Sequence, residues 1–576
     1  MRLFYHFIVL VLALPCQVTH SMHKDPLNVA FDDLTNHLND MAAKLGGNSG
    51  PKIKSGDGGS SKKSGGIKHP SGVPIGRAQR SEGTFDAHRD FFLDVMGLPE
   101  DTFRTSINFE NDLVNHLPKL KKLMNEERDQ WIGIYPMRQA IFEGICKFYT
   151  LNDLEQENAE IFKELPLKDK GLLQKKSRLR LLVAPTLGND ITTNILYLQA
   201  QPENKDSLNQ DASTFYGPLE GGEINADMEL EEMAKHAVQG ENAAIGAAPA
   251  TIYTKYFEPL RRSAQKKPWP FISLDTKGRD GVKKEDPRPR DYASNYWYLL
   301  QDFNDTNGKS LAKISWQKGK KPKIPARMIT GYNYTPGDEK KVGVLIKQNI
   351  VVSCGIDRNG NSMRLPIYLK ESGKVDRDNT QIISQVLTSA ANLGGTITTE
   401  RMKVLYGDPG ANTKYYKNNS LLQGYSSSIH SFCRTLLNGA YRGTIEAAYN
   451  IEKPRVFLTL VGGGAFRNPI NWIAAAIEEC VPLIYKYGLD VTIVYRPDKE
   501  RMINSKSEQL RNETTDLEFL TRMVVCIDQI NNTKLSQSGS LIKNLKKYLH
   551  AAYVTKNAND LKDAAEVINS NLNEST

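Results

Sequence analysis

The sequence predicts an α/β fold in which a mixed sheet is flanked by helices in three layers. Short β-branched runs bounded by turn residues indicate strands at 179–184, 195–199, 342–346 and 350–354. Runs with apolar residues three and four apart indicate helices at 227–237, 380–393, 427–450 and 469–487. The near-continuous apolar run at 456–461 is typical of a strand buried on both faces. Strands that alternate with helices predict a mainly parallel or mixed sheet.

The length and composition indicate a folded protein of two or three domains. The chain has 576 residues, of which 39% are apolar, and this is enough to form real cores and excludes global disorder. The 75 basic and 66 acidic residues leave a mild surplus of 9 positive charges. Such a surplus permits anionic partners and gives no clear sign of nucleic-acid binding. The sequence does not indicate an oligomeric state.

The N-terminus predicts a cleaved export signal at 1–21. Arg2 supplies a positive charge, and residues 7–14 (FIVLVLAL) form an apolar run of signal-peptide length. This run is too short to span a bilayer, and no later run reaches about eighteen apolar residues. We therefore expect a secreted protein without a transmembrane segment; the alternative is a buried N-terminal helix.

The cysteines argue against a disulfide framework and against a zinc site. Five remain after signal cleavage, they are widely spaced, and none forms a Cys-x-x-Cys pair: Cys146, Cys354, Cys433, Cys480 and Cys526. We expect no metal and no cofactor. An odd number of sparsely placed cysteines is also consistent with an exported protein that acts in the reducing cytosol of a host cell.

The remaining chain divides into four predicted segments. Residues 22–82 are rich in Gly, Ser and Lys and predict a flexible linker. Residues 83–177 predict a helical region, with apolar spacing that continues through 137–151 (MRQAIFEGICKFYTL). Residues 178–500 hold the α/β domain. Residues 501–576 predict C-terminal helices, in which Thr515 and Glu518 form a candidate capping box at a helix start.

A glycine-rich turn follows the apolar strand at 456–461. Gly462, Gly463 and Gly464 allow backbone N–H groups to approach a ligand, and the following helix adds its positive end. Asn468 is a candidate N-cap, and Pro469 suits the first helical position. The turn predicts a site for a phosphate-bearing ligand; the alternative is a tight turn that uses glycine only for geometry. It is neither a Walker P-loop nor a Gly-x-Gly-x-x-Gly motif.

The helix after this turn is expected to kink at Pro482 and to end at Gly488 in the left-handed conformation. Residues 489–495 (LDVTIVY) then return as a strand. Two other motifs have simple interpretations. Ser426–Ser428 with His430 lacks the surroundings of a nucleophile and indicates a polar helix start. Residues 357–361 (DRNGN) lack a glutamate at the twelfth position of a calcium loop and indicate a hairpin turn.

Three segments, in order along the chain, carry a family resemblance. VGGGAFRNPINWIAAAI at 461–477 resembles the Gly-x-Gly-Ala-Phe segment and Trp-bearing helix of poly(ADP-ribose) glycohydrolases, which have the macrodomain fold. NGAYRGTIE at 438–446 resembles the helix before that strand, and 238–257 resembles the Val-Gln-Glu-Glu segment with its Pro-containing helix. The resemblance implies a macrodomain-like domain that binds ADP-ribose or an ADP-ribosylated partner.

The resemblance also implies roles for particular residues. Gly462, Gly464 and Ala465 would wrap the diphosphate, and Phe466 would pack near the ribose. Glu241 would act on the ribose–ribose bond, and Gln239 would fix the adjacent backbone. The full set of expected site residues is Gln239, Glu241, Gly462, Gly463, Gly464, Ala465, Phe466 and Asn468.

The sequence departs from the family pattern at two places. Gly240 replaces the first glutamate of the pair, and the second glycine-rich diphosphate loop is absent, with Gly221-Gly222 as the nearest substitute. Binding without turnover therefore stays open. The alternative function is a secreted interaction or effector protein that keeps the fold as a non-catalytic scaffold, with Phe466 or Arg467 across the turn. A nucleotide-using enzyme of another doubly wound type is a third option, disfavoured because the turn lacks a lysine.

Overall fold

The computed structural model describes residues 73–74, 84–96, 99–100, 144–186, 190–212, 230–234, 239–252, 254, 337–370, 375–391, 420–464, 466, 468–497 and 506–574. All of them lie within the compact unit Ser64–Thr576. The predicted export signal and, apart from Val73–Pro74, the predicted linker lie outside the described residues. Within these ranges, no helix is both long and apolar enough to cross a membrane.

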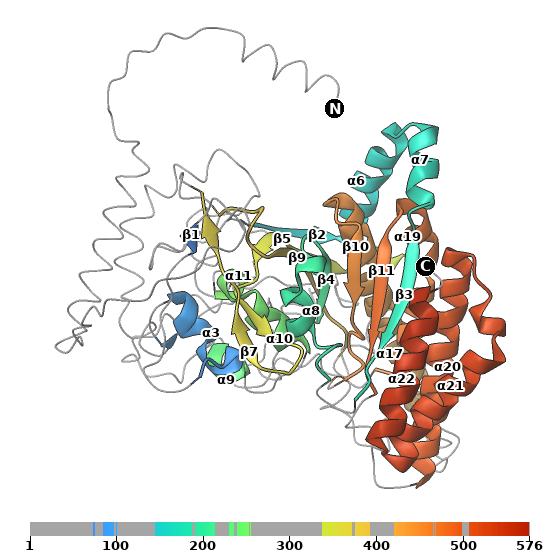
Figure 1. The fold of residues 1–576 in the computed structure, drawn as a ribbon. Helices are drawn as coiled ribbons and strands as arrows, with labels where there is room; N and C mark the ends of the chain where they lie inside the picture. Colours follow the sequence, from blue (N-terminus) through green and yellow to red (C-terminus); the bar gives the residue numbers. More distant parts are fainter. Residues whose placement is uncertain are drawn as a thin grey trace, which may run out of the picture. The chain divides into compact units, whose positions relative to one another are not determined.

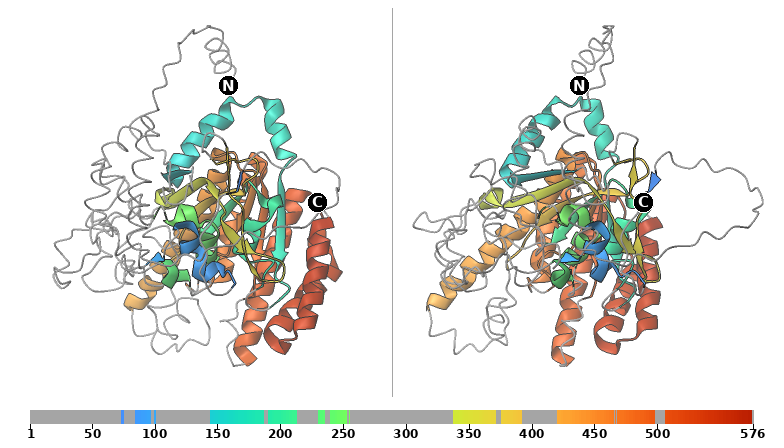
Figure 2. Two further views of the ribbon diagram at one scale, coloured as in Figure 1. Left: turned by 60° about the vertical axis from the view of Figure 1, so that its left-hand side comes forward. Right: turned by 90° about the vertical axis from the view of Figure 1, so that its left-hand side faces the viewer.

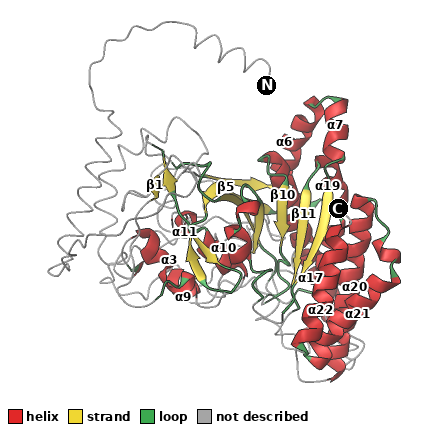
Figure 3. Ribbon diagram, viewed as in Figure 1, coloured by secondary structure: helices red, strands yellow, loops and turns green. Residues whose placement is uncertain are grey.

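A seven-stranded sheet organises the fold (Figures 1 and 3). Its order is β2 (Ile145–Thr150), β5 (Gly343–Val351), β9 (Ile382–Thr388), β4 (Leu208–Ala212), β10 (Arg455–Leu458), β11 (Asp490–Tyr495) and β3 (Arg178–Val183). The five strands from β9 to β3 run parallel, whereas β5 pairs antiparallel with both β9 and β2. The predicted mixed α/β fold is therefore confirmed.

Helices cover both faces of the sheet. On one face, α17 (Ser420–Asn450) packs closely against the sheet. The closeness is shown at Gly439, where an added Cβ would lie 2.4 Å from Val342 Cβ, beside β5. Gln210 of β4 also points to this face and donates a hydrogen bond to Thr444 of α17 at 3.0 Å. On the other face, Gln385 Nε2 donates to the carbonyl of Ala243 in α10 (Gln239–Gly246) at 2.8 Å.

The C-terminal helices close the β3 edge. These are α20 (Lys506–Asn531), α21 (Gly539–His550) and α22 (Ala558–Glu574), and all views place α20 and α22 along β3 (Figures 1 and 2). The Asn531 side chain accepts a hydrogen bond from Leu179 N–H at 3.0 Å and donates one to the Leu179 carbonyl at 2.9 Å. The Asn569 side chain in the same way accepts from Val183 N–H and donates to the Val183 carbonyl, both at 3.0 Å. The two amides satisfy backbone groups that an open edge strand would leave unpaired.

Shorter elements complete the described fold. The helices are α3 (Ala87–Met96), α6 (Leu151–Glu164), α7 (Leu167–Gln174), α8 (Ile195–Ala200), α9 (Leu230–Met233), α11 (Ala248–Ile252), α18 (Ile470–Glu478) and α19 (Val481–Tyr487). Single turns lie at Pro202–Asn204, Asp338–Lys341, Leu535–Gln537 and Ala551–Thr555. Two small antiparallel pairs join β6 (Cys354–Ile356) to β7 (Ser362–Arg364) and β1 (Val73–Pro74) to β8 (Tyr368–Leu369). Thus one part of the predicted linker pairs as a strand.

Several predicted elements are confirmed. The strands β3, β5, β10 and β11 and the helix α17 form where the sequence predicts them, whereas the strand predicted at 350–354 is divided between the end of β5 and the first residue of β6. Gly488 ends α19 with φ 69°, in the left-handed conformation. The expected kink near Pro482 is a full break between α18 and α19. The hairpin at 357–361 also forms: Asp357 accepts N–H bonds from Asn359 and Asn361, each at 2.8 Å. The five cysteines that follow the predicted signal are free and buried.

Other predictions of element type are wrong. Residues 195–199, predicted as a strand, form α8, because the Asn194 side chain caps it by accepting Leu196 N–H at 2.9 Å. Residues 380–393, predicted as a helix, contain β9, whose seven residues are all buried, so no period-two pattern is visible. The predicted helix at 137–151 contains β2, and the candidate capping box at Thr515 lies inside α20. Of the predicted helix at 227–237, the structure describes residues 230–234, and these contain the short helix α9.

Lys347 of β5 lies in a buried polar row that crosses the sheet. The strand register places it beside Cys146 of β2 and Gln385 of β9, and Gln385 beside Asn209 of β4. Among the described residues, Lys347 is the one buried basic side chain, and its Nζ has no hydrogen-bond partner there. Burial lowers the pKa of Lys347 to about 8, and the Coulombic effects of Asp211 and Cys146 oppose this shift.

We predict that Lys347 makes the protein more stable as the pH rises from about 8 to 10.5. Unfolding returns the pKa to its ordinary value of 10.5, so in this window the unfolded chain binds the additional proton. One pKa unit corresponds to about 1.4 kcal/mol, so the full effect on the free energy of unfolding is roughly 3 kcal/mol. Urea unfolding on both sides of the window measures it, with Lys347→Met as the non-titrating control. The same pH dependence in both proteins would contradict the prediction.

Candidate functional site

The glycine turn lies at the carboxyl edge of the parallel strands, directly after β10. Gly462 has φ +79°, in the left-handed region. A Cβ at Gly462 would lie 2.5 Å from Ala390 Cβ and 2.7 Å from Asn468 Nδ2. Gly462 is therefore required by both its conformation and its close neighbours.

The other two glycines differ in role. Gly463 is buried, and its N–H donates to the carbonyl of Leu460 at 2.9 Å, so it stabilises the turn itself. Gly464 is exposed, and a Cβ added there would meet no atom within 4 Å. Gly464 is consequently the position at which the backbone is open to a ligand.

Asn468 holds the turn from inside. Its Nδ2 donates to the carbonyl of Ala391 at 2.8 Å and contacts the carbonyls of Gly462 at 3.2 Å and Phe466 at 3.5 Å. Asn468 is 1% exposed, and α18 takes Pro469 as its N-cap, so the predicted capping role of Asn468 is wrong. Its side chain instead ties the turn to the segment after β9.

Tyr441 of α17 fixes the backbone just before the turn. Its hydroxyl donates to the carbonyl of Thr459 at 2.8 Å and accepts Val461 N–H at 3.0 Å. Burial raises the pKa of Tyr441, so the hydroxyl keeps the proton that it donates. Phe466 is half-buried against the core, whereas Ala465 and Arg467 lie outside the described residues.

Glu241 lies in the first turn of α10 and is 3% exposed. The direction of α10 follows from two contacts. Ala243 C=O accepts from Gln385 in the middle of β9, while Gly246 C=O accepts from Ser353, which adjoins the amino end of β9. The first turn of α10 therefore points toward the carboxyl end of β9, the edge at which the glycine turn also lies.

Gln239 fixes backbone beside Glu241. Its Oε1 accepts Ile195 N–H at 3.0 Å, and its Nε2 donates to the carbonyl of Thr193 at 2.9 Å. These bonds join α10 to the residues that begin α8. Both polar ends of the Gln239 amide are thus engaged with protein backbone.

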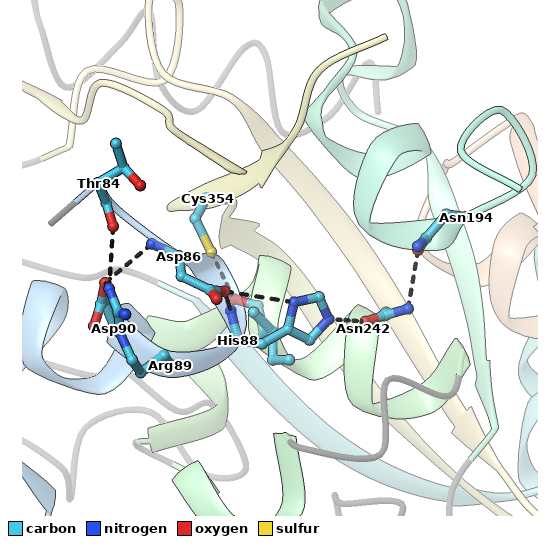
Figure 4. Close-up of polar contacts among 9 residues, drawn as sticks. Thr84, Asp86, His88, Arg89, Asp90, Asn194, Asn242 and Cys354 are labelled. Carbon is cyan, nitrogen blue, oxygen red and sulfur yellow. Dashed lines mark hydrogen bonds and ion pairs between the residues drawn. The ribbon is translucent and has the colours of Figure 1, made fainter. Parts of the chain in front are cut away.

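A second connection joins α10 to α3 (Figure 4). His88 Nε2 lies 2.7 Å from Asn242 Oδ1, and Asn242 Nδ2 donates to Asn194 Oδ1 at 3.1 Å. Asn194 is the residue that caps α8. The sequence offers no signal for this network, because His88 belongs to a segment with no chemical motif.

The described residues contain no group of three or more His, Cys, Asp or Glu side chains that could hold a metal ion. The polar groups described above include the backbone of the glycine turn, the side-chain amides of Gln239, Asn242 and Asn468, and the Glu241 carboxyl. Such a set can bind an anionic or sugar-bearing ligand by hydrogen bonds, and Glu241 can supply acid chemistry.

Comparisons with known proteins find matches among solved structures. No family model matches the sequence, and no curated protein matches it. One similar structure is poly(ADP-ribose) glycohydrolase from Deinococcus radiodurans in complex with ADP-ribose, with 9% identity over 65% of this chain and 95% of that chain and a TM-score of 0.29. Another is the Thermomonospora curvata enzyme bound to the inhibitor ADP-HPD, with 8% identity over 65% and 84% of the chains and a TM-score of 0.25.

We predict that Gly462→Ala destabilises the protein by about 1–3 kcal/mol, because alanine is strained at this φ and its Cβ would meet Ala390. Gly464→Ala is the matched control, since its Cβ meets no atom within 4 Å. The control should change the free energy of unfolding by less than about 0.5 kcal/mol. Urea unfolding measures both values, and equal effects of the two substitutions would contradict the assigned roles.

Proposed function

We propose that the protein binds ADP-ribose, free or attached to a protein, at the carboxyl edge of its sheet. The single observation that carries the proposal is the exposed backbone at Gly464, held in place from within by Asn468. A ligand that needs backbone N–H donors can approach Gly464, where a side chain is absent and an added Cβ would meet no atom within 4 Å. Ligands of open α/β sheets bind outside the carboxyl ends of the strands, and this turn occupies that location.

The diphosphate is the part of ADP-ribose that suits the turn. Its charge is favoured by backbone N–H groups and by the positive amino end of α18, which begins at Ile470. The choice of ADP-ribose over other diphosphates comes from the resemblance of 461–477 to the Gly-x-Gly-Ala-Phe segment. Phe466, at the end of that segment, would then pack near the ribose.

We further propose that Glu241 hydrolyses the glycosidic linkage. A general acid donates a proton to the leaving ribose oxygen as the bond from the anomeric carbon breaks; water then adds to that carbon, and its proton passes to the carboxylate, which restores the acid. Glu241 is the carboxyl of α10, and its helix turn points to the same edge as the glycine turn. We infer that this activity operates after export, in keeping with the N-terminal sequence and the free cysteines.

One observation favours the scaffold alternative. Glu241 is 3% exposed, whereas an acid that contacts substrate needs access to it. Under this alternative the protein binds a partner through the same fold and carries out no reaction. Binding and turnover experiments separate the two functions.

The binding proposal predicts a micromolar Kd for ADP-ribose, a free energy of roughly −8 kcal/mol, measured by calorimetry on the full chain. Gly464→Glu should weaken binding at least about tenfold, since it places a like charge against the diphosphate. Gly539→Glu is the matched control, because Gly539 is also an exposed glycine with no atom within 4 Å of a Cβ. The control should bind as the wild type does. No binding by the wild type, or equal binding by all three proteins, would refute the proposal.

The hydrolysis proposal predicts that Glu241→Gln loses turnover of an ADP-ribosylated protein by about 100-fold or more while ADP-ribose affinity changes little. The isosteric amide keeps the shape of the side chain and removes the acid. Release of ADP-ribose over time is the measurement. Equal rates in the two proteins would remove Glu241 from the mechanism, and binding without turnover in the wild type would favour the scaffold function.

A further inference from the structure

Helix α3 is firmly seated although it precedes the predicted α/β domain. Phe91 and Phe92 are 2% and 0% exposed. Asp94 Oδ1 accepts from Arg364 Nε of β7 at 2.6 Å, and the Arg364 guanidinium lies 4.1 Å from the centre of the Phe85 ring. Helix α3 also contacts α9, α10 and α11. It is therefore part of the same packed body as the candidate site.

The donors and acceptors of the α3–α10 connection can be assigned. Asn194 Oδ1 accepts Leu196 N–H, so it is the carbonyl oxygen that also accepts from Asn242 Nδ2. Asn242 consequently presents its own Oδ1 to His88, and an amide oxygen can only accept. His88 must therefore donate through Nε2.

The other ring nitrogen of His88 faces the start of α3. His88 Nδ1 lies 3.9 Å from Asp86 Oδ1, which accepts the His88 backbone N–H at 2.9 Å. Figure 4 shows Asp86, His88, Asn242 and Asn194 as one continuous series of polar contacts. The series begins on α3 and ends at the residue that caps α8.

Glu241 lies between two residues that are held in this way. Gln239 bonds the backbone at the start of α8, and Asn242 bonds both Asn194 and His88. The end of α10 is attached separately, where Cys354 Sγ donates to the carbonyl of Ile245 at 3.2 Å. Gln239 and Asn242 thus both hold the first turn of α10.

We propose that His88 is a positioning residue for Glu241 and that α3 is thereby part of the ligand site, an inference that rests on the function proposed above. His88 holds Asn242, and Asn242 fixes the turn from which the Glu241 side chain projects. The glycine turn stands on different elements, β10 and α18, and is fixed by Asn468. Loss of the His88 contact should therefore affect turnover and leave ligand affinity nearly unchanged.

Two substitutions in the full chain test this inference. His88→Gln can place an amide N–H where Nε2 lies and keep the bond to Asn242, whereas the shorter His88→Asn places its amide near Nδ1 and cannot reach. We expect His88→Asn to lower kcat for release of ADP-ribose from an ADP-ribosylated protein by about 10–100-fold, because small misplacements of reacting groups have effects of this size. KM and the Kd for ADP-ribose should change by less than about threefold, and His88→Gln should restore kcat to within about threefold of the wild type.

Other outcomes overturn the inference. An unchanged kcat in His88→Asn would exclude a positioning role. An equal loss of kcat and of ADP-ribose affinity in both variants, with a matching loss of stability to urea, would show that His88 only supports the fold.

A separate measurement distinguishes failure of this inference from failure of the proposed function. If the wild type shows no turnover, the hydrolysis proposal fails, and amide hydrogen exchange at Asn242, Ala243 and Ala244 tests the contact itself. Exchange faster in His88→Asn than in the wild type and His88→Gln would support the link from α3 to α10. Equal exchange in all three proteins would overturn it.

Discussion

The parallel pairing of β4 with β9 on one side and β10 on the other is the constraint on which the rest of the molecule depends. Because these strands run in the same direction, their carboxyl ends meet at one edge. The segment after β9 therefore lies against the turn after β10, where Gly462 leaves no room for a side chain beside Ala390. The pairing also requires long crossovers, and the helices of these crossovers cover both faces of the sheet.

Side-chain amides provide partners for backbone groups at several places in the described part of the chain. Asn531 and Asn569 bond the outer edge of β3, Asn468 bonds the segment after β9, and Gln239 bonds the start of α8. An amide side chain carries both a donor and an acceptor, so it can replace a missing strand or helical turn. The candidate site is thus held by the same kind of side-chain amide contact that closes the sheet edge. At the site, His88 also donates a hydrogen bond to the Asn242 amide.

The strands that the sequence predicts correctly are those whose local pattern matches their environment. The run at 456–461 and the run at 179–184 are apolar and bounded by turn residues, and β10 and β3 form there. The errors at α8 and β9 have the same cause, since burial on all sides hides periodicity. All six residues of α8 and all seven of β9 are buried, so neither shows a polar face from which helix and strand could be distinguished.

The sequence by itself determined the mixed α/β fold, the glycine turn after a buried strand, and the left-handed position of Gly488, because each depends on consecutive residues. A family resemblance also predicts Glu241 and Gln239 as site residues, without showing what they contact. The tertiary structure alone decided that Asn468 supports the turn from within, that Gly464 is its open position, and that β2 joins the sheet. It also joined His88 to Asn242, which lie 154 residues apart. Contacts at such separations are set by how the chain folds back on itself, and no local pattern records them.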